Sequence, residues 1–331
     1  MIAIVRCKYA RRDSERHSQS KSTALTFVHC YPCTTTACTS ICTPWLECLQ
    51  LQVPGVKYTS QTRRPCRSRK QTTLDMQAPC LQVLSDIHLE FRTSRAFDFP
   101  MTAPNLCLLG DIGDPSTAAY KHFLHTQAER FDQVFVLKGN HSCYGRSLEE
   151  ADDLIAQACA AYPNKLHYLN KTAIDLDQNY VILGCTLWSH VINRQRLMVL
   201  SMLADNHHIT KWSVTRNNEV HAAELEWLTS EIAKVKASGR QAVVLTYHAP
   251  SCRGTSAPEH IDSPISSAFG SDIEYLLKPP VVLWMFGHTH YSSDQRINGV
   301  RLCSNQLGYP NEGVKFDPGF KVQLASPGLE S

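Results

Sequence analysis

The sequence LQVLSDIH, residues 81–88, joins a short apolar run to two side chains that can bind a metal ion. The apolar residues predict a buried strand, and polar side chains after such a strand project from the rim of a sheet, where α/β proteins place their active sites. Asp86 and His88, one residue apart, offer an oxygen and a nitrogen that can face one divalent cation. An Asp-x-His pair after a strand is also common in ordinary turns, so alone it is a weak signal.

Four later clusters of polar residues follow apolar runs in the same way. They are GDIGD (110–114) after NLCLL, GNH (139–141) after QVFVL, His248 after VVLTY, and GHTH (287–290) after VVLWMF. Each cluster alone is most often a turn or a surface histidine. Five clusters in chain order, each at the carboxyl end of a predicted strand, instead favour one common site. Because they supply Asp, Asn and His together, we expect that site to hold two divalent ions.

Predicted strands and helices alternate after residue 80. We expect strands over 105–109, 133–137, 242–246 and 281–286, each a short and strongly apolar run. Helices are predicted over 117–131 and from Ser147, where Glu150 gives the spacing of a capping box. Two runs joined without a helix, 166–169 and 180–183, predict an antiparallel addition. The alternation predicts an α/β protein.

Residues 189–218 are the least regular part of the region after residue 80. A long loop in a compact domain is usually functional, so we predict a lid loop over a site. Asn218 is then expected to cap a helix that ends at Gly239, because Asn favours the N-cap and Gly the position after the last turn. Residues 80–331 are thus predicted to form one domain with this lid.

Residues 1–79 differ in composition from the rest of the chain. They carry 12 Lys and Arg against 4 Asp and Glu, and 8 of the 14 Cys lie before Leu81. They have no sustained hydrophobic period, so we predict a disordered leader, or a segment upstream of a native start at Met76. The alternatives are a zinc cluster around Cys30 and Cys33 and an Arg-rich transit peptide. We expect deletion of residues 1–75 to leave folding and activity unchanged.

Residues 80–331 are acidic, with 21 Lys and Arg against 26 Asp and Glu. An acidic domain can bind cations but disfavours long nucleic acid, which needs a basic surface. The Cys residues are scattered singly in apolar runs, as in a reduced protein, and no run approaches the roughly 18 apolar residues of a membrane span. We therefore expect a cytoplasmic protein without a membrane partner, or an organellar one if residues 1–75 are a transit peptide.

The five clusters resemble the motifs of the calcineurin-like metallophosphoesterases, whose pattern is D-x-H, GDxxD, GNH followed by an acid, a lone His, and GHxH. Here they are DIH, GDIGD, GNHS, YH and GHTH, from Leu81 to about Tyr291. The resemblance implies a four-layer α-β-β-α sandwich of two mixed sheets flanked by helices. It also implies two groups of ligands that share Asp111. One ion would be held by Asp86, His88, Asp111 and His290, and the other by Asp111, Asn140, His248 and His288.

Two divalent ions about 3.5 to 4 Å apart lower the pKa of a bridging water and clamp the phosphoryl oxygens during in-line attack, so the predicted nucleophile is hydroxide. We predict His141 as the general acid for the leaving group, because the adjacent Asn140 fills the ligand role, and Asp114 as a residue that can orient His141. The resemblance implies the same role for His141. Ser142 stands where the family commonly has an acid, a change that can weaken a hydrogen bond near His141.

The sequence therefore predicts a hydrolase of phosphomonoesters or phosphodiesters, with two divalent ions of Mn, Fe or Zn as cofactors. The expected substrate is a small phosphoester or a phosphoprotein. The motifs do not distinguish a monoester from a diester, and they leave the oligomeric state open. One alternative is a non-catalytic interaction scaffold that keeps the fold, although every expected ligand and the general acid are retained. Another is a hydrolase with a single zinc ion.

Overall fold

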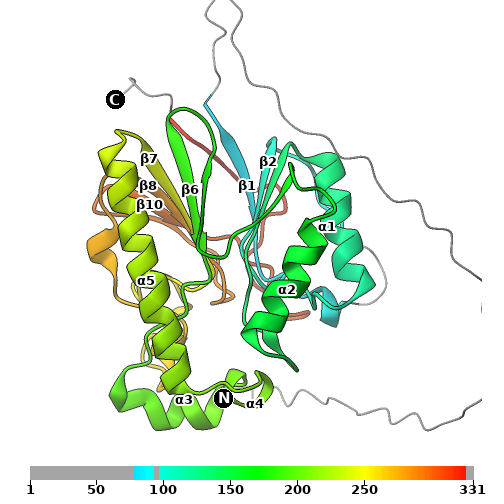
Figure 1. Cartoon of the computed structure of the whole chain (residues 1–331). Helices are drawn as coiled ribbons and strands as arrows, with labels where there is room; N and C mark the ends of the chain where they lie inside the picture. The colour runs from blue at the N-terminus through cyan, green and yellow to red at the C-terminus, as the bar shows by residue number, and fades with distance from the viewer. Residues whose placement is uncertain (1–77, 93–96, 326–331) are drawn as a thin grey trace, which may run out of the picture. The chain divides into compact units, whose positions relative to one another are not determined.

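Two mixed β-sheets form the centre of the computed structural model, which describes residues 78–92 and 97–325 (Figure 1). The strand order is β11-β1-β2-β3-β4 in the first sheet and β5-β6-β7-β8-β10-β9 in the second. The described residues belong to one compact unit. The predictions of a leader, a zinc cluster and a transit peptide concern residues that lie outside the described ranges.

The first sheet is parallel apart from one edge. Its strands are β1 (Cys80–Leu84), β2 (Asn105–Leu108), β3 (Gln133–Val136), β4 (Leu166–Tyr168) and β11 (Lys321–Gln323). β1 to β4 run parallel, and β11 pairs with β1 in the antiparallel sense. Every residue of β2 is buried, as expected for a parallel strand that is covered on both faces.

The second sheet has four parallel strands at its centre and an antiparallel strand at each edge. Its strands are β5 (Thr172–Asp175), β6 (Tyr180–Cys185), β7 (Gln241–Thr246), β8 (Val281–Met285), β10 (Val300–Cys303) and β9 (Asp294–Ile297). β6, β7, β8 and β10 run parallel, while β5 and β9 run antiparallel to their neighbours. The predicted strands at 105–109, 133–137, 242–246 and 281–286 are confirmed.

Helices cover the outer face of each sheet, which gives the predicted four-layer sandwich (Figure 1). α1 (Ala118–Arg130) and α2 (Leu148–Cys159) pack on the first sheet, and α5 (Val214–Ala237) packs on the second. A third apolar layer lies between the sheets and includes Leu81, Val83, Phe135, Ile182, Val243 and Leu283. Burial of these three layers supplies the main stabilisation of the fold.

Local capping signals explain where two helices begin. Ser147 and Glu150 form the predicted capping box at the start of α2, with both reciprocal hydrogen bonds present. The prediction that Asn218 caps α5 is wrong, because the cap is Ser213, whose side chain accepts from the Arg216 backbone N–H. Asn218 lies inside the helix and bonds both backbone groups of Val191. α5 ends as predicted before Gly239, which has a φ of +72°.

The segment 189–218 is not irregular, contrary to the prediction of a lid loop. It contains α3 (Arg196–Met202), α4 (Asp205–His208) and the first residues of α5. Val191, Val199 and Val214 pack together with Ala268, so the segment has a small apolar core of its own. The short 3-10 helices are η1 (Leu89–Phe91), η2 (His141–Cys143), η3 (Asn193–Gln195), η4 (Pro258–His260), η5 (Ser266–Ala268) and η6 (Glu274–Leu276).

The predicted antiparallel pairing of 166–169 with 180–183 is also wrong. Residues 166–168 form β4, which extends the first sheet in parallel with β3, and residues 180–185 form β6 in the other sheet. The antiparallel partner of β6 is β5, a half-exposed edge strand. Among the described helices, none is both long and apolar enough to cross a membrane.

Candidate metal centre

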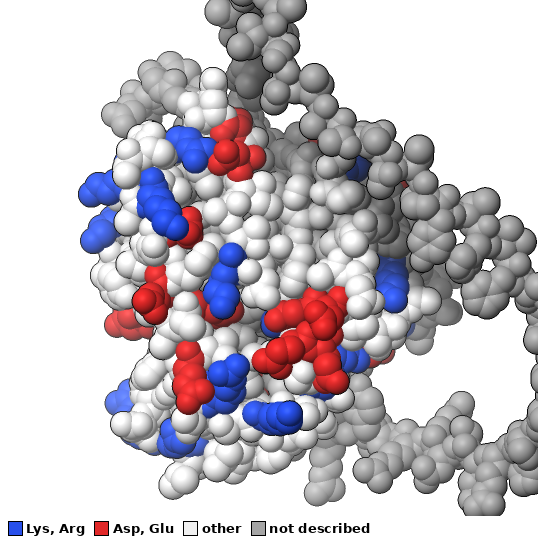
Figure 2. All heavy atoms as spheres, viewed as in Figure 1, with Lys and Arg blue, Asp and Glu red and all other residues white. Residues whose placement is uncertain are grey.

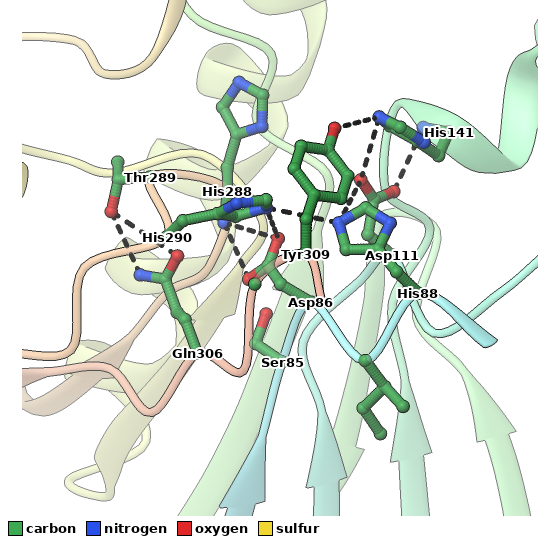
Figure 3. Close-up of polar contacts among 12 residues, drawn as sticks. Ser85, Asp86, His88, Asp111, His141, His288, Thr289, His290, Gln306 and Tyr309 are labelled. Atoms are coloured by element: carbon green, nitrogen blue, oxygen red, sulfur yellow. Dashed lines mark hydrogen bonds and ion pairs between the residues drawn. The ribbon is translucent and has the colours of Figure 1, made fainter. Parts of the chain in front are cut away.

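The carboxyl ends of strands from both sheets bring five of the predicted ligands to one place, namely Asp86, His88, Asp111, His288 and His290 (Figure 3). Asp86 follows β1, Asp111 follows β2 and Asn140 follows β3, while His248 follows β7, and His288 and His290 follow β8. Backbone hydrogen bonds fix the turns against each other, because His88 N donates to Asp111 O at 2.9 Å and Gly287 N donates to Tyr247 O at 2.9 Å. Residues that lie more than two hundred positions apart in sequence, such as His88 and His290, therefore face a common centre.

Five of the predicted ligands have an unusual backbone conformation. The φ angles are +54° at Asp86, +50° at His88, +47° at Asp111, +75° at His288 and +48° at His290. A left-handed conformation costs a non-glycine residue on the order of 1 to 3 kcal/mol, and it persists only where the surrounding structure enforces it. Strain of this kind, shared by the residues around one centre, is typical of a functional site.

Gly139 lets the third cluster approach the second. A Cβ atom at Gly139 would lie 2.0 Å from Oδ1 of Asp111, which no side chain could tolerate. The approach allows the backbone N–H of His141 to donate to the same Oδ1 atom at 3.0 Å. The glycine in GNH is thus needed for contact between two clusters of the site.

His88 and His290 face each other through their Nε2 atoms, which lie 3.1 Å apart. The Nδ1 atom of His88 lies 3.0 Å from Glu90 Oε1, and the Nδ1 atom of His290 lies 2.6 Å from Glu312 Oε2. A carboxylate on Nδ1 holds the proton there and leaves the Nε2 lone pair free, which is the usual arrangement for a metal-binding histidine. Two such lone pairs directed at one point require a proton or a cation between them.

Two carboxylates lie beside these imidazoles. Asp86 Oδ1 is 3.6 Å from His290 Nε2, and Asp111 Oδ2 is 3.8 Å from His88 Nε2. Asp86 is fully buried and accepts the backbone N–H of His288. Burial raises the pKa of Asp86, and neighbouring Asp111 raises it further, although His290 and His88 lower it.

The donor set fits a divalent cation. One ligand atom each from Asp86, His88 and His290 lies within 4.8 Å of the others, and the same holds for His88, Asp111 and His141. Burial lowers the pKa of His290, but Glu312, Asp86 and Asp111 outweigh this effect and raise it. The centre therefore has a negative potential that favours a positive charge, as the oxygen and imidazole ligands of a divalent metal do.

Asn140 is oriented by a carboxylate from the segment that was predicted to be a lid. Its Nδ2 atom donates to Asp205 Oδ1 at 2.7 Å and to the Tyr144 hydroxyl at 3.2 Å, and Tyr144 also donates to Asp205. Asp205 is buried at the start of α4. These bonds fix the amide so that its carbonyl oxygen points toward the centre, where it accepts from the Tyr247 hydroxyl at 3.0 Å.

His248 and His288 are buried side by side, with ring centroids 4.2 Å apart. Burial lowers the pKa of His248 to about 3, and burial together with the nearby histidines lowers that of His288 well below its usual value. Nδ1 of His248 has no hydrogen-bond partner, and no hydrogen bond or ion pair joins this residue to Asp111 or Asn140 among the described residues. The Tyr247 hydroxyl donates to Asp111 Oδ2 at 2.6 Å and lies 3.0 Å from Asn140 Oδ1.

His141 lies at the edge of the centre between a carboxylate and a phenol. Its Nδ1 atom is 3.4 Å from Glu90 Oε1. Its Nε2 atom is 2.9 Å from the Tyr309 hydroxyl and 4.0 Å from Asp111 Oδ2 (Figure 3). Burial lowers the pKa of His141, but Asp111 and Glu90 outweigh it, and the result is a raised pKa. The environment thus favours the protonated ring that a general acid needs.

Asp114 does not orient His141, contrary to the prediction. Its Oδ1 atom accepts from the backbone and hydroxyl of Ser116, and from Nη2 of Arg146 at 2.8 Å. The carboxylate beside His141 is Glu90, whose pKa is about 2 because hydrogen bonds to His141 and His88 overcome the effect of burial. Glu90, and not Asp114, is therefore the carboxylate that contacts His141.

Ser142, which replaces an acid of the family motif, is buried in η2. Its backbone carbonyl accepts from Nη1 of Arg146 at 2.7 Å, so Arg146 joins this loop to Asp114. Arg146 thus bonds the turn after Asn140, and Asp205 bonds the Asn140 side chain itself.

Several residues of the centre were missed in the sequence. Glu90 follows His88 by two residues, and this spacing was a usable signal. Tyr247 directly precedes His248 in VVLTYH, and its hydroxyl contacts Asp111 and Asn140. Tyr309, Glu312 and Asp205 lie in segments without any motif, and only the fold brings them to the other residues.

Comparison with known proteins gives a family match. A sequence model described as calcineurin-like phosphoesterase matches residues 83–292, a range that includes all five clusters. Among curated proteins, "Uncharacterized protein L509" of Acanthamoeba polyphaga mimivirus is 28% identical over 268 residues, which cover 72% of this chain and 94% of that protein.

Solved structures share the fold at low sequence identity. A phosphopantetheinyl hydrolase from Mycobacterium tuberculosis has a TM-score of 0.57 and 15% identity, covering 71% of this chain and 92% of that one. A dimetal phosphatase from Danio rerio has a TM-score of 0.44 and 13% identity, covering 70% of this chain and 88% of that one. The first of these likenesses supports the same sandwich architecture.

Proposed function

The chain belongs to the calcineurin-like phosphoesterase family, and from this premise we propose that it is a metal-dependent hydrolase of phosphoric esters. The observation that carries the proposal is the pair of imidazoles whose Nε2 atoms meet 3.1 Å apart while glutamates hold their Nδ1 atoms. That pairing, next to two buried aspartates, is costly without a cation and favourable with one.

Asp86, His88, Asp111 and His290 are the proposed ligands of one divalent ion, of Mn, Fe or Zn. A divalent ion held there lowers the pKa of water and polarises phosphoryl oxygens, which is the chemistry that phosphoester hydrolysis needs. Asp111, Asn140, His248 and His288 are the proposed ligands of a second ion. Glu90 and Glu312 position the two imidazoles and keep their Nε2 lone pairs directed inward.

His141 is the proposed general acid. With Glu90 accepting from Nδ1, a protonated His141 carries its second proton on Nε2, the atom that faces Tyr309 and Asp111. A leaving-group oxygen that displaces the Tyr309 hydroxyl from this atom can take that proton directly. Tyr309 thereby holds the position of the leaving group, and its ring also packs on His88 and His290 at centroid distances of 4.5 and 4.6 Å.

The proposed substrate is a small phosphoester or a phosphoprotein rather than long nucleic acid. On the face seen in Figure 2, acidic side chains gather over α2, whose sequence LEEADDLIAQAC carries four of them, and Lys and Arg are dispersed. Binding of a long polyanion depends on a continuous basic surface. Both monoester and diester hydrolysis are compatible with the proposal.

The test is hydrolysis of p-nitrophenyl phosphate and its bis ester by metal-free protein, with Mn²⁺, Fe²⁺ or Zn²⁺ added back. We expect release of p-nitrophenol that depends on the added metal, and the preferred ester identifies a monoesterase or a diesterase. A phosphopeptide and a cyclic nucleotide, assayed in parallel by phosphate release and product separation, extend the comparison. Absence of turnover with every substrate and metal would contradict the proposal and favour the non-catalytic scaffold.

A further inference from the structure

The phenol of Tyr309 occupies the position that a leaving group would take. Its hydroxyl oxygen is 2.9 Å from Nε2 of His141, the atom that is proposed to donate the proton. A hydrogen bond of this length is the contact expected between a general acid and a leaving-group oxygen. The side chain of Tyr309 therefore shows where a phenolic oxygen and its ring fit beside the metal centre (Figure 3).

Four aromatic rings, those of His88, His290, Phe91 and His141, surround the Tyr309 ring and form an aromatic cage. The centroids of His88 and His290 lie 4.5 and 4.6 Å from that of Tyr309, and those of Phe91 and His141 lie 5.5 and 5.8 Å from it. The four contacts are tilted or edge to face, which are arrangements in which aromatic rings attract one another. The aromatic cage therefore fits a flat ring that carries an oxygen toward His141.

Phe91 is the wall of the aromatic cage that a ligand can reach from solvent. It is 37% exposed, whereas His88 is fully buried. Its ring also contacts those of His88 and His141, at centroid distances of 5.8 and 5.9 Å. An exposed apolar ring beside the proposed general acid offers a contact for an apolar group of a substrate.

Few contacts hold the Tyr309 side chain in the aromatic cage. Among the described residues, its one side-chain hydrogen bond is to His141, and the turn 310–313 that follows it is exposed. A ligand with a phenolic oxygen and a ring replaces these contacts one for one, so the exchange has a small net cost. The bond between Glu312 and His290 does not involve the Tyr309 side chain, so rotation of that side chain leaves the imidazole in position.

We propose that the aromatic cage is the leaving-group subsite, and that the substrate is a phosphate ester of a phenol, whose ring takes the place of Tyr309. The inference rests on the proposed function and names the substrate class of the same site. In Tyr309 the oxygen that meets His141 is bonded directly to the ring. In a nucleotide a sugar separates the ester oxygen from the base, so this geometry favours a phenol over a nucleotide.

The reaction then releases the phenol and inorganic phosphate. The oxygen of water bonds to phosphorus while the bond from phosphorus to the phenolic oxygen breaks. That oxygen takes the Nε2 proton of His141, and a proton lost by the water restores His141 for the next cycle.

The experiment is calorimetric titration of the full chain, loaded with Mn²⁺, with phenylphosphonate and cyclohexylphosphonate. Neither compound can be hydrolysed, and both carry a ring of six carbons, of which only the first is aromatic. We expect the wild type to bind phenylphosphonate roughly 2- to 10-fold more tightly, the usual contribution of aromatic contacts. Phe91→Ala should lose most of this preference. Tyr275→Ala, which removes an exposed ring outside the aromatic cage, should keep it.

Substitutions of Tyr309 distinguish a side chain that the ligand displaces from a fixed wall of the site. Tyr309→Ala empties the aromatic cage, so it should bind phenylphosphonate roughly threefold or more tightly than the wild type does. Tyr309→Phe loses only the bond to His141 and should lie between the two. Circular dichroism checks that each variant is folded. The inference is overturned if Tyr309→Ala binds phenylphosphonate no more tightly than the wild type, or if the wild type binds both phosphonates equally.

Hydrolysis assays separate the two sources of such an ester and the two proposals. Phenyl phosphate stands for a free ester and a phosphotyrosine peptide for a protein side chain, and the higher kcat/KM identifies the source. Metal-dependent hydrolysis of glycerol phosphate by a protein that binds both phosphonates equally would leave the proposed function standing and would remove only this inference.

Discussion

Oε1 of Glu90 lies 3.4 Å from Nδ1 of His141, across the edge of the metal centre. The same carboxylate bonds His88, so one side chain positions a proposed ligand and the proposed general acid together. Because Glu90 follows His88 in the same turn, its contact with His88 depends on local geometry. Its contact with His141 depends on the fold, because the two residues are far apart in sequence. The glutamate thus contacts both a proposed metal ligand and the proposed general acid.

Replacing Glu90 with Gln should shift the pH dependence of catalysis. Glu90 helps to raise the pKa of His141, so loss of its charge lowers that pKa. A general acid works in its protonated form, and activity is lost as the pH rises through its pKa. The basic limb of kcat/KM against pH should therefore move to lower pH in Glu90→Gln. An unchanged limb, with metal content preserved, would contradict the role of Glu90.

Asp114→Asn is the matched comparison for Glu90→Gln. Because Asp114 bonds Ser116 and Arg146 and not His141, its loss should leave the basic limb where it is in the wild type. The cost should appear in stability, at about 1 kcal/mol of unfolding free energy, as expected for a partly exposed pair and a turn. Urea denaturation and a pH profile measure both quantities. A shift of the limb as large as in Glu90→Gln would restore the orienting role first predicted for Asp114.

His141→Ala should lower kcat by roughly 10²- to 10⁴-fold, the usual contribution of a general acid. Its metal content should equal that of the wild type, because the contact of residue 141 with Asp111 Oδ1 is made by the backbone N–H, which alanine retains. A substrate with a better leaving group should recover part of the lost rate, since it needs less protonation. Equal losses for good and poor leaving groups would argue against proton donation by His141.

Glu224 gives a stability prediction that is independent of catalysis. This buried residue of α5 accepts from the Trp188 backbone N–H, and burial raises its pKa from 4.5 to about 7. Between these values the folded chain binds a proton that the unfolded chain has lost, so the unfolding free energy falls as the pH rises. The expected loss is about 3 kcal/mol between pH 4.5 and 7.

Urea denaturation of Glu224→Gln at pH 5 and pH 8 tests this. The variant keeps an acceptor for Trp188 but has no charge to bury, so its stability relative to the wild type should be greater at pH 8 than at pH 5. If the unfolding free energies of the variant and the wild type differ by the same amount at pH 5 and pH 8, Glu224 does not titrate in this range.

Much of the fold followed from local signals in the sequence. The capping box of Ser147 and Glu150 involves residues three apart, so the start of α2 could be predicted. The start of α5 could not, because Ser213 and Asn218 are both good caps, and Asn218 bonds Val191, which is distant in sequence. In α3, Leu197 is 79% exposed, and the helix lacks the apolar stripe by which it could have been recognised.

The site was predictable where ligands lie in motifs at strand ends. Asp86, Asp111 and His290 were named from such motifs, and the structure brings them to one centre. Glu312 and Tyr309 belong to a loop whose position depends on the whole fold, so no local pattern reveals them. His248 was named from its place after a strand, and the structure buries its ring beside that of His288, at a centroid distance of 4.2 Å.

The most direct test of the account is Mn²⁺-dependent hydrolysis of p-nitrophenyl esters by metal-free wild type and Asp86→Asn. Asp153→Asn, an exposed residue of α2, serves as the matched control for the change of Asp to Asn. We predict that the rate and the bound Mn²⁺ rise together in the wild type and in Asp153→Asn, and that Asp86→Asn loses both. Equal rates with and without metal, or full activity in Asp86→Asn, would contradict a metal-dependent hydrolase at this centre.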